Sequence, residues 1–282
     1  MTIKLIQEKF LNDLKDIYPR EEINSFFYML CKSCLNKNRL DLALDPNLEL
    51  SAENSAVFLE ALKSLKKEYP IQYIIGHSEF MELLLEVNEQ VLIPRPETEE
   101  LISWIIESQP EDSPVSVLDI GTGSGCIAVV LAKQLSKSKI DAMDVSEKAL
   151  KVAKRNAARH NVDIDFFRRD ILDGKGLSKT YDIIVSNPPY VRESEKHHMH
   201  ANVLKYEPDL ALFVSDNDPL LFYRHIAKLA LNGLAPKGLL YFEINQYLAK
   251  DLQGLLEMLG YENIELKKDI YGADRMIRAV KI

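Results

Sequence analysis

The chain has 282 residues, of which 46% are hydrophobic and 28% are charged, and its formal net charge is −8. This composition is typical of a globular protein with one large domain or two smaller ones. An acidic chain is poorly suited to hold nucleic-acid phosphates, no apolar run reaches membrane-spanning length, and three cysteines cannot build a disulfide framework. We therefore expect a cytoplasmic protein with no direct nucleic-acid partner and no membrane association, and its amphipathic N-terminus lacks a signal-peptide core.

Residues 1–75 are expected to form a helical domain. Apolar residues recur there at helical spacing in three stretches, at residues 5–17, 26–35 and 57–65. Cys31 and Cys34 have the spacing of a redox pair or of half a zinc site. Both fall on the apolar stripe and no second cysteine pair exists, so we interpret them as core residues.

Residues 76–93 are expected to form a β-hairpin linker. Its two strands would be Phe80–Val87 and Gln90–Ile93, joined around Asn88. A proline-containing arm follows and leads into a helix, because Pro96 suits the first helical turn. This linker would join the helical domain to a third region.

From residue 94 to residue 282, predicted strands and helices alternate. The expected strands are Val115–Ile120, Ile140–Asp144, Ile164–Phe167, Tyr181–Ser186 and Leu239–Ile244, followed by Asn263–Leu266 and Met276–Lys281. This alternation predicts an α/β fold, a doubly wound and mostly parallel sheet with helices on both faces. Ligands of such sheets bind at the carboxyl ends of the strands.

Polar residues follow the first three of these strands. A glycine-rich loop comes after the first strand, and its glycines let the backbone turn tightly and approach a ligand. Its spacing does not fit the dinucleotide fingerprint, so a pyrophosphate ligand is the weaker prediction. Asp144 ends the second strand, where an acid can bind both hydroxyls of a ribose. Asp170 follows the third strand and is placed to face an adenine amino group, with Ile171 against the ring. The loop residues predicted to bind the ligand are Gly121, Thr122, Gly123, Ser124 and Gly125.

The strand Tyr181–Ser186 runs into Asn187-Pro188-Pro189-Tyr190. Prolines lack an N–H donor and force the preceding residue into an extended conformation, so the chain leaves the sheet as a stiff arm. The arm offers a side-chain amide, a carbonyl fixed by proline and an aromatic ring. These groups predict a clamp for a planar group that bears an NH2. A plain strand followed by a proline turn is the alternative.

This arm resembles the [Asn/Asp]-Pro-Pro-[aromatic] motif of S-adenosylmethionine-dependent methyltransferases that modify a planar nitrogen, and the whole set resembles the class I methyltransferases. The full chain is similar to the HemK/PrmC family, which methylates the glutamine of the Gly-Gly-Gln motif in class I peptide-chain release factors. Residues 215–220 differ from this family, which usually has glycines there. The matching stretches are Gln72–Gly76, Ile93–Glu99, Asp119–Gly125, Asp144, Asn187–Tyr190, Glu207-Pro208 and Tyr223-Arg224.

The resemblance implies a class I methyltransferase fold in residues 94–282, with S-adenosylmethionine as the cofactor. It implies that Asn187 and the Pro188 carbonyl accept the two hydrogens of the target amide, and that Tyr190 packs on the amide plane. Pro189 would complete the substrate contact, and Asn187 would also touch the cofactor. No dedicated general base and no metal is required. Because every cofactor-type motif lies after residue 90, we expect the helical domain to recognise the protein substrate.

Several alternatives remain open. A methyltransferase for adenine in DNA or guanine in RNA would need a basic groove, which this acidic chain does not show. A methyltransferase for a ribosomal-protein glutamine would use the same active-site residues. A non-catalytic module that docks on translation factors would not need both an intact loop and an intact arm. The segment His197–His200 is interpreted as a mobile loop over the substrate rather than a metal site. Arg168 and Arg169 are interpreted as a solvated pair.

Overall fold

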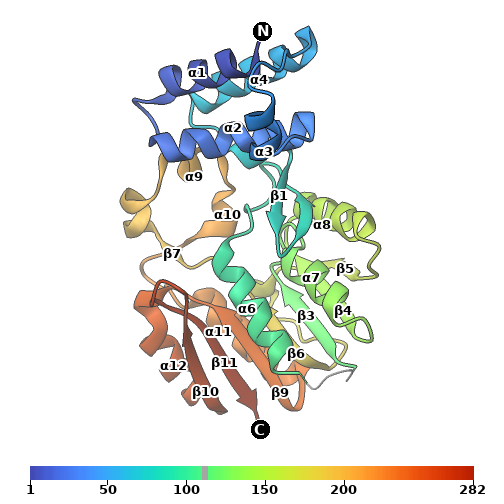
Figure 1. Ribbon diagram of the computed structural model, residues 1–282. Helices are drawn as coiled ribbons and strands as arrows, with labels where there is room; N and C mark the ends of the chain where they lie inside the picture. Colours follow the sequence, from blue (N-terminus) through green and yellow to red (C-terminus); the bar gives the residue numbers. More distant parts are fainter. Residues whose placement is uncertain (110–113) are drawn as a thin grey trace. The chain divides into compact units, whose positions relative to one another are not determined.

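The computed structural model describes residues 1–109 and 114–282, and the chain divides into two compact units (Figure 1). One unit consists of Met1–Gly76 together with His200–Tyr206. The other consists of His77–Met199 together with Glu207–Ile282. The hairpin that follows Gly76 therefore groups with the second unit, and a short segment from the later part of the chain groups with the first.

The first unit is helical, as expected. Its core lies between the apolar faces of α1, α2 and α4, where Phe10, Phe27 and Phe58 contact one another with ring centroids 5.8 to 6.3 Å apart. Cys31 is buried in this core, and burial raises the pKa of its thiol to about 12, so the thiol is protonated at neutral pH. The core interpretation of Cys31 is confirmed. The helices are α1 (Ile3–Leu14), α2 (Arg20–Leu35), α3 (Arg39–Leu44), α4 (Ala52–Leu65), α5 (Ile71–Ile75) and α9 (Ala201–Tyr206).

The short helix α9 is held to the rest of the helical unit by side chains near its end. The Tyr206 ring meets Tyr69 edge-on at 4.9 Å, and the Tyr206 hydroxyl donates to the Lys67 carbonyl at 2.8 Å. Lys205 and Glu68 form an ion pair at 2.5 Å. His200–Tyr206 thus packs within the helical unit, which the sequence analysis did not predict.

The hairpin lies earlier in the chain than expected. It consists of β1 (His77–Phe80) and β2 (Leu83–Glu86), paired antiparallel. Met81 and Glu82 form the turn with φ of 44° and 63°, and positive φ at both central residues is typical of two-residue hairpin turns. The predicted turn around Asn88 is therefore wrong. The apolar residues Val87, Val91 and Ile93, which follow β2, are buried, but they lie in a loop and not in a paired strand.

The second unit contains a seven-stranded sheet within the described residues, in the order β10-β11-β9-β6-β3-β4-β5. In the run β9-β6-β3-β4-β5, each strand is parallel to its neighbours. The strand β11 pairs antiparallel with both β9 and β10. The mostly parallel, doubly wound sheet is confirmed. Strand order reverses beside β3, and ligands bind at such switch points. The strands are β3 (Ser116–Ile120), β4 (Lys139–Asp144), β5 (Asp165–Arg168), β6 (Tyr181–Ser186), β9 (Leu234–Glu243), β10 (Tyr261–Lys268) and β11 (Asp274–Lys281).

Successive side chains of a strand point to opposite faces of the sheet, and helices cover both faces. Val117 and Ile183 pack in one apolar cluster with α6 and α7, whereas Leu118 and Ile184 pack in another with α11 and α12. No helix in the described part of the chain is long and apolar enough to cross a membrane. The helices and short strands of this unit are α6 (Pro96–Glu107), α7 (Cys126–Gln134), α8 (Glu147–Arg159), β7 (Val191–Arg192), α10 (Asp209–Leu212), β8 (Phe213–Val214), α11 (Leu221–Gly233) and α12 (Ala249–Met258), with 3-10 turns at Ile171–Asp173, Glu193–His198 and Gln246–Leu248.

Candidate active site

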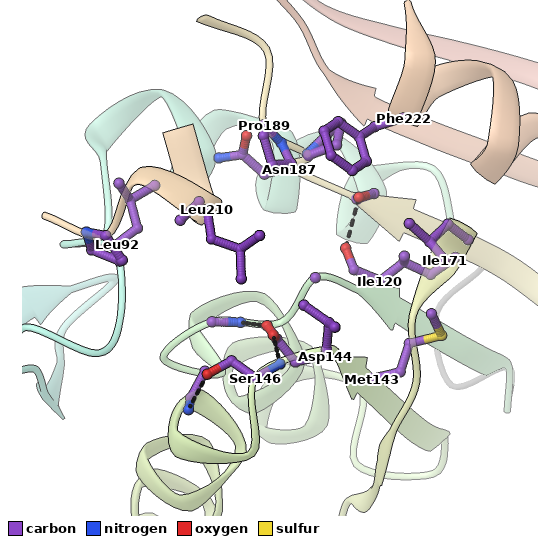
Figure 2. Close-up of a pocket in the computed structure, with 18 of the residues that line it drawn as sticks. Leu92, Ile120, Met143, Asp144, Ser146, Ile171, Asn187, Pro189, Leu210 and Phe222 are labelled. Carbon is purple, nitrogen blue, oxygen red and sulfur yellow. Dashed lines mark hydrogen bonds between the residues drawn. The ribbon is translucent and has the colours of Figure 1, made fainter. Parts of the chain in front are cut away.

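A cavity of about 290 Å³ lies at the carboxyl edge of the sheet, where β3, β4 and β6 end. The glycine loop and Asp144 line it, as do Asn187, Pro188 and Pro189. Figure 2 shows Asp144 and Asn187 on opposite sides of the cavity, with the Leu210 side chain pointing into the space between them. The fold thus brings together groups that the sequence placed after neighbouring strands.

The three glycines of the loop differ in what surrounds them. Gly121 and Gly123 line the cavity with φ of 76° and 55°, and no heavy atom lies within 4 Å of where a Cβ would stand. A ligand can therefore approach their backbone closely. Gly125 has a φ of 82°, and its Cβ would lie 3.0 Å from the Ala153 Cβ. Gly125 thus lets the loop pack against α8.

Thr122, Ser124 and Gly125 lie outside the cavity lining of the described residues. The Thr122 hydroxyl donates to Asp119 at 2.6 Å, and the Ser124 carbonyl accepts from the buried Asn156 side chain at 2.9 Å. Both bonds stabilise the loop from within the protein. Burial of Asp119, together with the nearby charge of Asp144, raises the pKa of the Asp119 carboxyl to about 7.

Asp144 both holds the loop and faces the cavity. One carboxylate oxygen accepts the Gly123 amide hydrogen at 2.9 Å, and the other accepts the Ser146 amide hydrogen at 2.8 Å. Burial raises the pKa of Asp144, and these amide hydrogen bonds oppose that effect. A carboxylate has about four acceptor sites, so Asp144 can still accept hydrogens from two ribose hydroxyls.

A mixed polar and apolar wall continues from Asp144. Asp170 lines the cavity, and its side chain accepts the Leu172 amide hydrogen at 2.9 Å. Ile171, Met143 and Phe222 supply apolar surface in the same cavity. The two acids are suited to bind hydroxyl groups and an amine, and the apolar residues beside them are suited to pack on a flat ring. This lining fits the adenosine part of S-adenosylmethionine.

The arm is held by buried residues that the sequence analysis missed. Glu243 is the last residue of β9 and is 1% exposed. It accepts hydrogen bonds from the Thr98 hydroxyl at 2.5 Å and from the Tyr190 hydroxyl at 3.0 Å, and Asn187 donates its side-chain amide to Thr98 at 3.3 Å. Tyr190 packs against the core and lies outside the cavity lining of the described chain. One signal was present, because a carboxylate directly ends a buried strand at Glu243, as at Asp144.

A second buried carboxylate, Glu207, precedes residues that line the cavity. It accepts the Ile93 amide hydrogen at 3.1 Å and pairs with Arg95 at 2.6 Å. Pro208 and Leu210, just after it, contribute to the cavity wall. Glu207 therefore joins the segment before α6 to the wall of the cavity.

Two basic or histidine-rich segments have structural explanations. Arg169, expected to be solvated, has a side chain that is only 13% exposed, donates to the Gly176 carbonyl at 3.0 Å and pairs with Asp173 at 3.3 Å. That expectation is wrong for Arg169, because its guanidinium organises the loop after β5, whereas Arg168 is exposed as expected. The His197 and His198 rings contact each other, with centroids 3.8 Å apart and an angle of 44° between the ring planes. Among residues 1–109 and 114–282, no group of three His, Cys, Asp or Glu side chains is arranged to hold a metal.

Residues 215–220, which depart from the family pattern, are fixed by their acids. Asp216 accepts from the Ser194 hydroxyl at 2.6 Å. Asp218 pairs with two nitrogens of Arg224 at 2.7 and 2.8 Å. Side-chain hydrogen bonds thus order this loop without glycines.

Comparison with known proteins identifies relatives over the whole chain. Residues 8–76 match the PrmC N-terminal domain, and residues 101–207 match the methyltransferase small domain. The release factor glutamine methyltransferase of Flavobacterium psychrophilum is 50% identical and covers 99% of both chains. Its counterparts from Bacteroides thetaiotaomicron and Lactococcus lactis are 46% and 40% identical, with coverage of at least 94% of each chain.

Solved structures share the fold at low identity. A methyltransferase from Pyrococcus furiosus superposes with a TM-score of 0.53 at 20% identity, covering 82% of this chain and 99% of that one. The Thermus thermophilus 16S rRNA N2 G1207 methyltransferase, solved with AdoMet and guanosine, also gives 0.53 at 15% identity, covering 73% of this chain and 50% of that one. These likenesses confirm the class I methyltransferase fold.

Proposed function

The chain belongs to the release factor glutamine methyltransferase family, and we propose that it methylates the side-chain amide nitrogen of the glutamine in the Gly-Gly-Gln motif of class I peptide-chain release factors. The methyl donor is S-adenosylmethionine, which supplies an electrophilic methyl group when it is bound. The observation that carries the proposal is one cavity with Asp144 on one side and the Asn187 arm on the other.

On the cofactor side, each residue has a distinct task. Gly121 and Gly123 leave their backbone open to the ligand. Asp144 accepts hydrogen bonds from the ribose hydroxyls, while Asp170 and Ile171 hold the adenine. The remaining loop residues, Thr122, Ser124 and Gly125, keep this backbone in place from behind.

On the substrate side, the arm must orient a weak nucleophile. The lone pair of a carboxamide nitrogen is delocalised into its carbonyl, so the nitrogen attacks only when it is held in the right direction. The Asn187 side-chain oxygen and the Pro188 carbonyl accept the two amide hydrogens, and the apolar Leu92, Leu210 and Pro189 line the cavity around them. Orientation and reduced contact with water account for most of the expected rate enhancement.

Incubation of the protein with labelled S-adenosylmethionine and a class I release factor tests this function. Mass spectrometry should place one methyl group on the glutamine of the Gly-Gly-Gln motif. A release factor with alanine at that glutamine is the control and should stay unlabelled. The proposed substrate would be contradicted if a glutamine of a ribosomal protein became methylated while the release factor gained no label.

A further inference from the structure

A chain of hydrogen bonds lies beneath the arm and joins residues that are far apart in the sequence. Asn187 donates to the Thr98 hydroxyl at 3.3 Å, and Thr98 donates to Glu243 at 2.5 Å. Tyr190 donates to the other oxygen of Glu243 at 3.0 Å. Thr98 and Glu243 are 2% and 1% exposed, so their bonding partners come from the protein.

The chemistry of these groups sets the direction of every bond. Both hydroxyls donate to the Glu243 carboxyl group, Thr98 to one oxygen and Tyr190 to the other. The Thr98 hydroxyl has one hydrogen and has already donated it, so Thr98 can only accept from Asn187. Asn187 must therefore turn its NH2 toward Thr98, which leaves its carbonyl oxygen on the opposite side of the amide.

Opposing effects act on the carboxyl group of Glu243. Burial raises its pKa above the usual value, and the hydrogen bonds from Thr98 and Tyr190 and the positive charge of Arg275 oppose this rise. Charge-assisted hydrogen bonds between a hydroxyl and a carboxylate are short, as the 2.5 Å distance from Thr98 is.

We propose that Thr98 and Glu243 are positioning residues that fix the amide orientation of Asn187 and so present an acceptor, not a donor, to the target glutamine. This inference rests on the proposed function. With the amide turned over, the Asn187 NH2 would face the NH2 of the target, and two donors cannot bond. The Thr98 hydroxyl is thus needed for methyl transfer although it acts only through Asn187.

Two substitutions at Thr98 separate its hydroxyl from its shape. Thr98→Val keeps the volume and removes the acceptor, so turnover on the release factor should fall about 10-fold or more through loss of orientation. Thr98→Ser keeps the hydroxyl and should stay within about 2-fold of the original protein. Calorimetric affinity for S-adenosylhomocysteine should be unchanged in both. The control is Ser103→Ala, which removes another hydroxyl of α6, one that donates to the Glu99 carbonyl at 2.9 Å.

A double-mutant cycle tests whether Thr98 acts through Asn187. In an Asn187→Ala background, single-turnover assays should show no further loss when Thr98→Val is added, because the group that Thr98 orients is gone. Equal losses in both backgrounds would overturn the proposal, as would a Thr98→Ser variant as slow as Thr98→Val.

Nitrogen NMR of the free protein gives a measurement independent of turnover. In the Asn187 side-chain NH2, hydrogen bonding should change the chemical shift of one of the two protons. This change should disappear in Thr98→Val but persist in Thr98→Ser and Ser103→Ala. An unchanged spectrum in Thr98→Val would overturn the proposal. Failure of the original protein to methylate the release factor would instead overturn the proposed function.

Discussion

At the scale of single residues, Asp144 supports the loop and lines the cavity with the same carboxylate. We expect Asp144→Ala to weaken cofactor binding, because the ribose loses charge-assisted hydrogen bonds worth about 1.5–3 kcal/mol each. Calorimetric titration with S-adenosylhomocysteine measures this loss. Asp163→Ala, at an exposed site just before β5, is the matched control and should bind normally. Unchanged affinity in Asp144→Ala would remove the ribose assignment.

Asp119 predicts a pH dependence of stability. Its pKa is raised by burial to about 7, from an ordinary value of 3.8. Below pH 3.8 the carboxyl group is protonated in both the folded and the unfolded state and does not change the free energy of unfolding. As the pH rises from 3.8, its raised pKa in the folded state lowers the free energy of unfolding increasingly, until the effect levels off near pH 7. Asp119→Asn removes this cost, so its stability advantage should grow by about 2–3 kcal/mol between about pH 5 and pH 8. Parallel unfolding curves for the two proteins across this range would contradict the prediction.

Single residues also mark the limit of prediction from the sequence. Asp144 and Asn187 were predicted because each follows a recognisable strand, which is a local signal. Thr98 lies 89 residues from Asn187 and 145 residues from Glu243, and only the packed sheet brings the three together. No local sequence pattern indicates that the Thr98 hydroxyl of α6 lies at the ends of β6 and β9.

At the scale of elements, the different surroundings of Gly125 and Gly254 predict opposite effects of an added methyl group. Gly125→Ala places a methyl group 3.0 Å from the Ala153 Cβ at a φ of 82°, and the left-handed conformation alone costs about 1–2 kcal/mol. Gly254 lies inside α12 with no heavy atom within 4 Å of a new Cβ, so Gly254→Ala should stabilise by about 0.5–1 kcal/mol. Urea unfolding measures both. A Gly125→Ala variant as stable as the original would show that the loop adjusts freely.

The same scale explains which elements were predicted well. The strand β6 has the predicted bounds, and Ser146 caps α8 by accepting the Ala149 amide hydrogen. The hairpin was misplaced because its turn, Met81-Glu82, contains neither glycine nor asparagine. The strand β9 begins five residues before the predicted start at Leu239, since pairing with β6 outweighs the local signals against a strand.

At the scale of the whole molecule, the chain crosses between its two units more than once. His200–Tyr206 belongs to the helical unit, yet Glu207, the next residue, is buried in the methyltransferase unit. Prediction from the sequence placed boundaries after residues 75 and 93 and none here, because the edge-on contact of Tyr206 with Tyr69 joins residues that are distant in the sequence. Only the folded chain shows that His200–Tyr206 belongs to a different unit from the residues directly before and after it.

This division predicts the outcome of removing residues 1–76, the N-terminal part of the helical unit. A variant that begins at His77 keeps the hairpin, whose Phe80 and Leu85 are buried in the core of the methyltransferase unit. Every residue that lines the cavity is also kept, so S-adenosylhomocysteine should bind with unchanged affinity by calorimetry. Methylation of an intact release factor should fall through a higher KM, because we expect residues 1–75 to recognise the protein substrate. Thermal unfolding with and without S-adenosylhomocysteine checks that the shortened chain folds. An unchanged KM for the release factor in a folded variant would assign substrate recognition to the methyltransferase unit instead.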